Sequence, residues 1–312
     1  MFRKLSTFWS KKISALITYA FVRYSSIMGR SFDLVNKSQK AREKDYLAFN
    51  CRATLFSLLS DPIVFLDVGA GGASEPVTHR YSEFFSSIFV EPRTSEAVKL
   101  KNSGALVIDK CVSDKVDSRI LYRTSVDELS SLLSPNSDFA SYYSSGMEVV
   151  GTTQIETTTI SKALAEFDVK HLDYLKVDTQ GTELDVLKGL GNYRPIFVRV
   201  EIYFVPIYKE CCLIWNIGEF LSNNGYVMFD LAYRSNYLRR SPRYYMEPVG
   251  RLPTGGRVWF MPNWKCEKGR ELILERDLQY AKLMTMFGMK DVLEEVFSEL
   301  ITPNRDKILV VL

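Results

Sequence analysis

From residue 62 onward, short apolar runs alternate with stretches of helical pattern. Apolar runs of this length, bounded by glycine, proline or charged residues, are typical of parallel strands that are covered on both faces. The alternation therefore predicts an open α/β sheet with helices on both sides. The runs are Ile63–Val68, Ser87–Val90, Ala105–Ile108, Leu172–Val177, Ile196–Ile202, Tyr226–Leu231 and Arg257–Met261.

Helices are expected between these runs, at Glu75–Phe85, Leu184–Leu190 and Leu213–Leu221. Residues 112–160 are less regular, and there Arg119–Arg123 and Gln154–Ile160 resemble extra strands while Ser130–Ser145 resembles a polar loop. Residues 267–300 have a helical pattern with a break expected at Gly288.

The charge of the 312 residues is nearly balanced, with 40 basic and 37 acidic side chains and a net charge of +3. Nucleic acid is therefore not the expected partner. Residues 1–30 carry six basic and no acidic residues, and the remaining 34 basic and 37 acidic residues leave a net charge of −3. This N-terminal stretch predicts either a helix covering the main domain or an amphipathic helix on an anionic membrane surface.

The apolar run Ile13–Val22 is too short to span a membrane, and no small-residue cleavage site follows it. Five scattered cysteines without a C-x-x-C motif indicate reduced thiols and a cytoplasmic location. The only histidines are His79 and His171, so neither a zinc site nor a histidine-centred triad is expected.

A glycine-rich turn, Asp67-Val68-Gly69-Ala70-Gly71-Gly72, follows the first predicted strand. Glycines allow a tight turn and a close approach of the backbone to a ligand. A dinucleotide fingerprint requires Gly or Ala at the last position, where this chain has Ser74. The D-x-G-x-G pattern instead suits S-adenosylmethionine, whose amino-acid end carries an ammonium and a carboxylate.

Two further carboxylates follow the next strands. Glu91 ends the second strand, where a carboxylate can accept hydrogen bonds from both ribose hydroxyls of a nucleoside. Asp109, after the third strand, is a candidate acceptor for an adenine amino group, with Cys111 and Asp114 as alternatives in the same loop. Asp178 and Glu201 follow or end later strands, so both are expected to border the same crevice.

The order DVGAGG, FVEP, YLKVDTQGTELDVLKG, VRVEIYFVPIYKE and GGRVWFMP resembles the FkbM family of S-adenosylmethionine-dependent methyltransferases over residues 62–262. The resemblance implies a class I methyltransferase fold, a Rossmann-like sheet that is mostly parallel with an antiparallel last strand. It also implies O-methylation of a sugar, glycolipid or related natural product. Its donor-binding residues would be Asp67, Gly69, Ala70, Gly71 and Glu91.

This chain departs from the family pattern at two positions. Gly71 stands where Asn is usual, and Gln180 stands where Glu is frequent, so residue 180 is given no catalytic role. We expect three parts: a basic helical N-terminal extension at 1–60, the methyltransferase domain at 61–262 and a C-terminal helical extension at 263–312.

Methyl transfer to an alcohol requires loss of a proton, so a base or a metal assists it. We expect Asp178 and Glu201 to flank the acceptor hydroxyl, either with one of them as base or with both holding a Mg²⁺. The alternative is that Asp178 only orders its turn while Glu201 pairs with a basic side chain such as Arg199.

The segment 232–257 contains six arginines, four tyrosines and one acid. Arginine binds carboxylate or phosphate and tyrosine rings stack on sugars, so an anionic glycan or glycolipid is the expected acceptor. The contact residues proposed there are Arg239, Arg240, Arg243 and Tyr244. Two other functions stay open: an NAD(P)-dependent oxidoreductase and an inactive binding module on the same fold. The acceptor, the metal requirement and the oligomeric state are not determined by the sequence.

Overall fold

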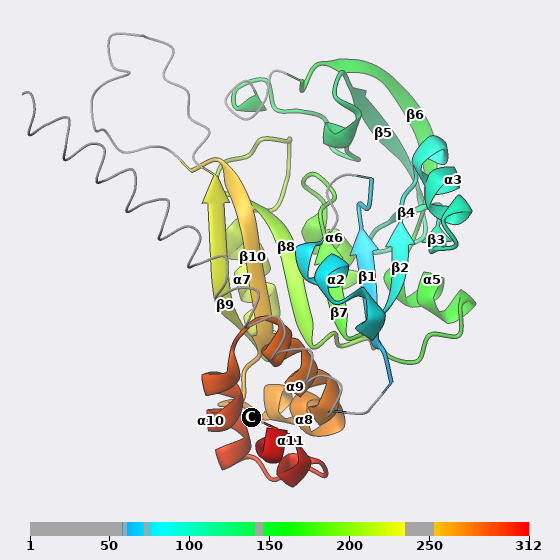
Figure 1. Ribbon diagram of the computed structural model, residues 1–312. Helices are drawn as coiled ribbons and strands as arrows, with labels where there is room; N and C mark the ends of the chain where they lie inside the picture. The colour runs from blue at the N-terminus through cyan, green and yellow to red at the C-terminus, as the bar shows by residue number, and fades with distance from the viewer. Residues whose placement is uncertain (1–57, 59–60, 72–74, 141–145, 235–252, 312) are drawn as a thin grey trace, which may run out of the picture. The chain divides into compact units, whose positions relative to one another are not determined.

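A seven-stranded sheet forms the centre of the computed structural model, which describes residues 58, 61–71, 75–140, 146–234 and 253–311. The strand order is β3-β2-β1-β7-β8-β10-β9, and only β10 is antiparallel to its neighbours. This order confirms the predicted class I methyltransferase sheet (Figure 1). The strands are β1 (Ile63–Val68), β2 (Phe85–Val90), β3 (Leu106–Ile108), β7 (Tyr174–Val177), β8 (Phe197–Tyr203), β9 (Tyr226–Arg234) and β10 (Gly255–Pro262).

A second, three-stranded sheet has the order β4-β6-β5 and lies beside the carboxyl ends of β1 and β2 (Figure 1). Its strands are β4 (Cys111–Val112), β5 (Ser118–Thr124) and β6 (Val149–Thr158). β5 and β6 form an antiparallel pair, which confirms the two extra strands expected in this region. A short 3-10 turn, η2 (Asp127–Leu129), follows β5.

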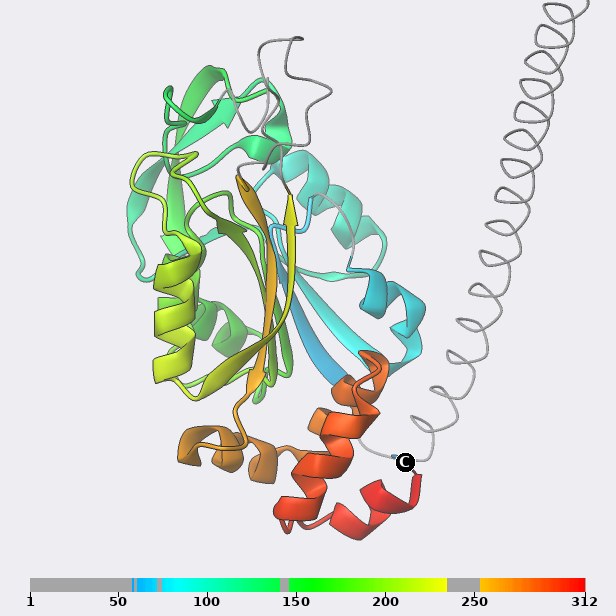
Figure 2. The same cartoon turned by 90° about the vertical axis from the view of Figure 1, so that its left-hand side faces the viewer.

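Helices cover both faces of the large sheet, as Figure 2 shows with α3 (Thr94–Asn102) and α7 (Ile214–Asn223) on opposite sides. On one face, α5 (Ile160–Glu166), α6 (Glu183–Lys188) and α7 bury apolar side chains against the strands. Because side chains alternate along a strand, every second residue faces these helices. The strand residues of this core include Leu66, Val68, Leu175, Val177, Val198 and Val200. Thr159 begins α5 by accepting a hydrogen bond from the Lys162 backbone N–H on its hydroxyl.

Four C-terminal helices follow β10: α8 (Glu267–Glu275), α9 (Asp277–Met286), α10 (Lys290–Glu299) and α11 (Arg305–Val311). Gly288, with φ +73°, separates α9 from α10, which confirms the predicted break. Phe287 contacts Tyr174 on β7 and Phe197 on β8, with ring centroids 5.8 and 5.0 Å apart. Phe287 thus packs on the face of the sheet opposite α5–α7, whereas Leu272 of α8 joins the core on the α5–α7 side.

One expected helix was too long. Instead of a helix over Glu75–Phe85, the chain forms α2 (Pro76–Arg80) and η1 (Ser82–Phe84), and Phe85 already pairs with Ile63 in the sheet. The predicted N-terminal extension lies outside the described residues. Within the described ranges, no helix has the length and apolar character needed to cross a membrane.

Candidate functional site

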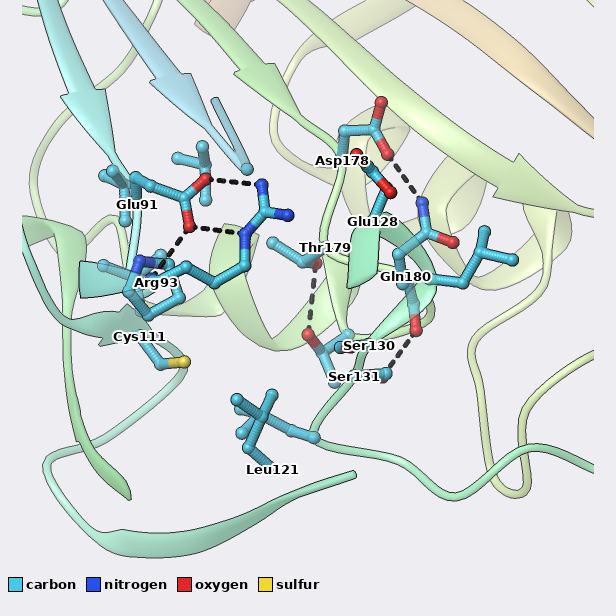
Figure 3. A pocket seen from close by; sticks show the side chains of 18 of the residues that line it. Glu91, Arg93, Cys111, Leu121, Glu128, Ser130, Ser131, Asp178, Thr179 and Gln180 are labelled. Carbon is cyan, nitrogen blue, oxygen red and sulfur yellow. Dashed lines mark hydrogen bonds and ion pairs between the residues drawn. The ribbon is translucent and has the colours of Figure 1, made fainter. Parts of the chain in front are cut away.

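A cavity of about 320 Å³ lies at the carboxyl ends of the central strands. Its walls come from the ends of β1, β2 and β7, from β4, β5 and the segment around η2, and from Glu201 on β8 and Arg257 on β10. Figure 3 shows Glu91 and Arg93 on one side of this cavity and Asp178 and Gln180 on the other. Parallel strands place their ligand sites at this edge, so the position matches the expected crevice.

The glycine turn after β1 crosses to the neighbouring strand. The backbone N–H groups of Gly69 and Ala70 both donate to the Val90 carbonyl oxygen, at 3.1 and 3.2 Å. Gly69 has φ +83°, and a Cβ on it would overlap the Asp178 carbonyl oxygen. Gly71 approaches the side chains of Glu91 and Arg93 so closely that a Cβ there would overlap both. The turn therefore needs glycine at position 69, whereas at position 71 a Cβ would displace the ends of the two side chains.

Asp67 has a protein partner in this structure. Lys176 Nζ donates to Asp67 Oδ1 at 2.6 Å, and both side chains are almost fully buried. The strand register creates the pair, because Asp67 on β1 lies opposite Lys176 on β7. Burial raises the pKa of Asp67, and the Lys176 charge opposes that rise. Asp67 does not line the cavity, so its predicted direct contact with the cofactor stays a prediction.

Glu91 lines the cavity and is 2% exposed. Its Oε1 accepts hydrogen bonds from the Arg93 backbone N–H at 2.9 Å and from Nε at 3.0 Å, and its Oε2 accepts from Nη2 at 3.1 Å. Arginine thus occupies the carboxylate oxygens that were expected to receive ribose hydroxyls. The bond to Glu91 also raises the pKa of Arg93.

Asp109 and Cys111 fall on different sides of their loop. Asp109 is exposed and pairs with Lys101 at 2.8 Å, which lowers its pKa, and it does not line the cavity. Cys111 is buried and does line the cavity, and burial raises the pKa of its thiol to about 12. The structure therefore brings the alternative residue, rather than Asp109, to the cavity.

Asp178 and Glu201 lie together at the cavity wall, joined by Gln180. The Gln180 amide nitrogen donates to Asp178 Oδ1 at 2.9 Å and to Glu201 Oε2 at 2.6 Å. Desolvation, and then the neighbouring Asp178 charge, raise the pKa of Glu201 well above its usual range. The pair therefore tends to retain a proton, as two carboxyl groups at one site do.

The loop that carries Asp178 and Gln180 is fixed from beneath by Glu183. The Glu183 carboxylate is fully buried and accepts hydrogen bonds from the backbone N–H groups of Thr179 at 2.9 Å and Gly181 at 3.0 Å. Burial raises the pKa of Glu183 to about 7. The loop has positive φ at Gln180 (+60°) and Gly181 (+109°), and these bonds hold that conformation.

The alternative expectation was that Glu201 pairs with Arg199, but within the described residues the ion-pair partner of Arg199 is a different carboxylate. Its guanidinium pairs with Glu75 at a buried contact and lies over the Trp259 ring. Arg257, which is opposite Glu201 in the β8–β10 register, lines the cavity and forms no ion pair within the described residues. The proposed acceptor contacts Arg239, Arg240, Arg243 and Tyr244 lie outside the described residues.

The residues around the two carboxylates do not fit a Mg²⁺ shared between them. The Gln180 amide nitrogen, a hydrogen-bond donor, already bridges Asp178 and Glu201. In the part of the chain that the structure describes, no three His, Cys, Asp or Glu side chains converge as metal ligands. Carboxylate and carbonyl oxygens are what Mg²⁺ prefers, and an amide N–H₂ between them opposes it.

A family comparison decides what kind of protein this is. The model of the methyltransferase FkbM domain matches residues 71–228, about half of the chain. The chain belongs to the FkbM methyltransferase family. The match spans the end of the glycine turn, Glu91, Asp178 and Glu201, so it includes the main walls of the cavity. The protein is therefore a methyltransferase. No curated protein matches this chain.

Solved structures with similar arrangements include other methyltransferases. Magnesium protoporphyrin IX methyltransferase from Synechocystis PCC 6803, with bound SAM, is 9% identical, with 69% of this chain and 79% of that chain covered and a TM-score of 0.33. TrmK from M. capricolum, in complex with S-adenosyl-homocysteine, is 10% identical, with 84% and 92% covered and the same TM-score. At these values the likeness carries no argument about function.

Several residues of the site were missed by the sequence analysis. Arg93, Lys176 and Gln180 all hold carboxylates that the analysis had singled out. Lys176 and Arg199 were visible as charges inside apolar runs, and a buried charge requires a partner. No comparable signal marked Arg93.

Proposed function

We propose that this methyltransferase uses S-adenosylmethionine to methylate a hydroxyl group of a sugar, glycolipid or related natural product. The observation that carries the proposal is the Asp178–Glu201 pair at the cavity wall. An alcohol must lose its proton on methylation, and a positioned carboxylate can accept it. Gly69 and Glu91 line the cavity, and we assign the donor to this part of it because Gly69 brings backbone to the wall without a side chain.

When bound, S-adenosylmethionine supplies an activated methyl group whose bond to sulfur breaks with the electron pair remaining on sulfur. Asp178 would accept the proton of the acceptor hydroxyl. Glu201 stays protonated because its raised pKa keeps it neutral beside Asp178. Most of the acceleration then comes from alignment of the acceptor, which the cavity walls provide.

An anionic acceptor is supported by Arg257. Its side chain lines the cavity and has no ion-pair partner among the described residues. A guanidinium binds carboxylate or phosphate with two parallel hydrogen bonds. Arg257 is the last residue of the arginine- and tyrosine-rich segment 232–257.

The test compares glycans and lipids, by untargeted mass spectrometry, from cells with the protein and cells without it. Feeding methionine with a deuterated methyl group marks every transferred methyl. We expect labelled methyl ethers on acidic glycans or glycolipids only in cells that contain the protein. A label found on nitrogen, on carbon or in RNA would exclude O-methylation of a sugar. Equal labelling of neutral and acidic acceptors would remove the role of Arg257.

A further inference from the structure

Gln180 occupies a conformation that glutamine rarely adopts. It is 8% exposed and has φ +60°, in the left-handed region that favours glycine. The buried Ser131 hydroxyl donates to its backbone oxygen at 2.6 Å, and Glu183 holds the next residue, Gly181. Backbone held in this region by several contacts often belongs to a functional site.

The Gln180 side chain is surrounded by four polar groups. Its amide nitrogen donates to Asp178 Oδ1 and Glu201 Oε2, as described above. Its Oε1 lies 3.2 Å from the Tyr203 hydroxyl and 2.9 Å from the Tyr208 hydroxyl, both of which can donate to it. Both tyrosine side chains are fully buried. Protein groups therefore contact both ends of the amide.

The charge of the carboxylates fixes which way the amide points. Rotating it by 180° would turn its carbonyl oxygen toward Asp178 and Glu201, where carboxylate oxygens repel it. Each tyrosine hydroxyl has one hydrogen and a second acceptor within reach: Glu201 Oε2 at 2.8 Å for Tyr203 and the Leu129 carbonyl at 2.9 Å for Tyr208. The two tyrosines can thus adjust to the proton count of the pair without moving.

We propose that Gln180 is a positioning residue for methyl transfer, whose amide holds Asp178 and Glu201 as a pair in which Asp178 carries the negative charge. Two amide hydrogens stabilise carboxylate oxygens on both partners. The hydrogen bonds that Gln180 and Tyr203 donate to Glu201 both end on Oε2. A glutamate at position 180 would bring a third ionisable carboxyl group, whereas glutamine adds donors without adding charge.

The groups facing Glu201 come from every neighbouring element. They are Asp178 after β7, Glu183 on α6, Tyr203 on the same strand, Tyr208 beyond it and Arg257 on β10. Asp178 and Glu183 disfavour its ionised form, and the Tyr203 hydrogen bond favours it. Gln180 adds a second donor on the same oxygen and bridges Glu201 to Asp178.

The test is an infrared pH titration of the full chain with S-adenosylhomocysteine bound. The carboxylic acid C=O band of Glu201 is assigned by its loss in Glu201→Gln. In Gln180→Met, which keeps the length but removes the amide, we expect the midpoint to rise by about one pH unit, a tenfold gain in proton affinity. Gln279→Met on α9 is the matched control, because Gln279 is also 8% exposed, and its midpoint should equal that of the unaltered chain.

An unchanged midpoint in Gln180→Met would overturn the proposal. If that variant does not fold, the same titration is measured in Tyr208→Phe, which removes a hydroxyl that orients the Gln180 amide. A smaller upward shift supports the role of Gln180, and no shift excludes it. The inference rests on the proposed function, but the titration requires no acceptor. Failure to find a methylated sugar would therefore reject the proposed function, and the titration would still test the role of Gln180 independently.

Discussion

We predict that Arg93 and the donor compete for the same carboxylate oxygens of Glu91. Arg93 donates to Oε1 and Oε2 of Glu91 through its side chain, and a ribose diol held by Glu91 requires those two atoms. Binding of the donor then exchanges two protein hydrogen bonds for two ligand hydrogen bonds. Arg93→Ala removes the protein partner and leaves the backbone N–H in place, so we expect tighter binding of S-adenosylhomocysteine.

The expected gain in affinity follows from the two side-chain hydrogen bonds between Arg93 and Glu91. Hydrogen bonds to charged groups contribute about 1.5–3 kcal/mol each. The Arg93 side chain is 23% exposed, so water screens part of this, and we take about 1.4 kcal/mol for the two bonds together. That corresponds to about tenfold tighter binding by isothermal titration calorimetry.

Arg119→Ala is the matched control for this measurement. Arg119 is 25% exposed, pairs with Asp185 and Asp114, and does not line the cavity. Its loss should leave the affinity for S-adenosylhomocysteine unchanged. If Arg93→Ala binds with equal or lower affinity than the unaltered chain, the guanidinium supports the bound donor and the competition argument is wrong.

Three further predictions concern the turn, the buried acid and the donor contact. Gly69→Ala should have a free energy of unfolding about 1–3 kcal/mol lower than that of Gly104→Ala, measured by urea unfolding, because both have φ near +84° but only Gly69 would overlap backbone. Glu183 has a raised folded pKa, so its stabilising contribution, about 3 kcal/mol, is present below about pH 4.5 and lost as the pH rises through about 7. Urea unfolding of Glu183→Gln should therefore depend less on pH over that range, and an identical dependence would contradict the assignment. Glu91→Ala should weaken S-adenosylhomocysteine binding at least tenfold, whereas Asp109→Ala, at an exposed ion pair, should not.

The strands were predictable because burial on both faces requires continuous apolar residues. Ile63–Val68 and Ile196–Ile202 are such runs, and both form central strands within one residue of the expected bounds. The helix after the glycine turn was overestimated, because the helical pattern of Glu75–Phe85 also covers the 3-10 turn η1 and the first residue of β2. Local pattern does not distinguish a helix end from a strand start when both are apolar.

The carboxylates of the site were predictable from their positions, but their partners were not. Glu91, Asp178 and Glu201 stand at strand ends, and the topology alone brings them to one edge. The pairing of Asp67 with Lys176 depends on strand register, which the sequence does not specify. Gln180 was set aside because it differs from the family pattern, although its amide is the group that joins the two carboxylates.

The insertion of β10 between β8 and β9 has a consequence for the order in which the chain folds. β9 leaves the ribosome before β10, yet its partner in the sheet is β10. A nascent chain that ends before Gly255 therefore has two strand edges without their native neighbour, at β8 and at β9. Such edges invite association between chains, so the last stage of synthesis, rather than the first, governs whether this protein escapes aggregation.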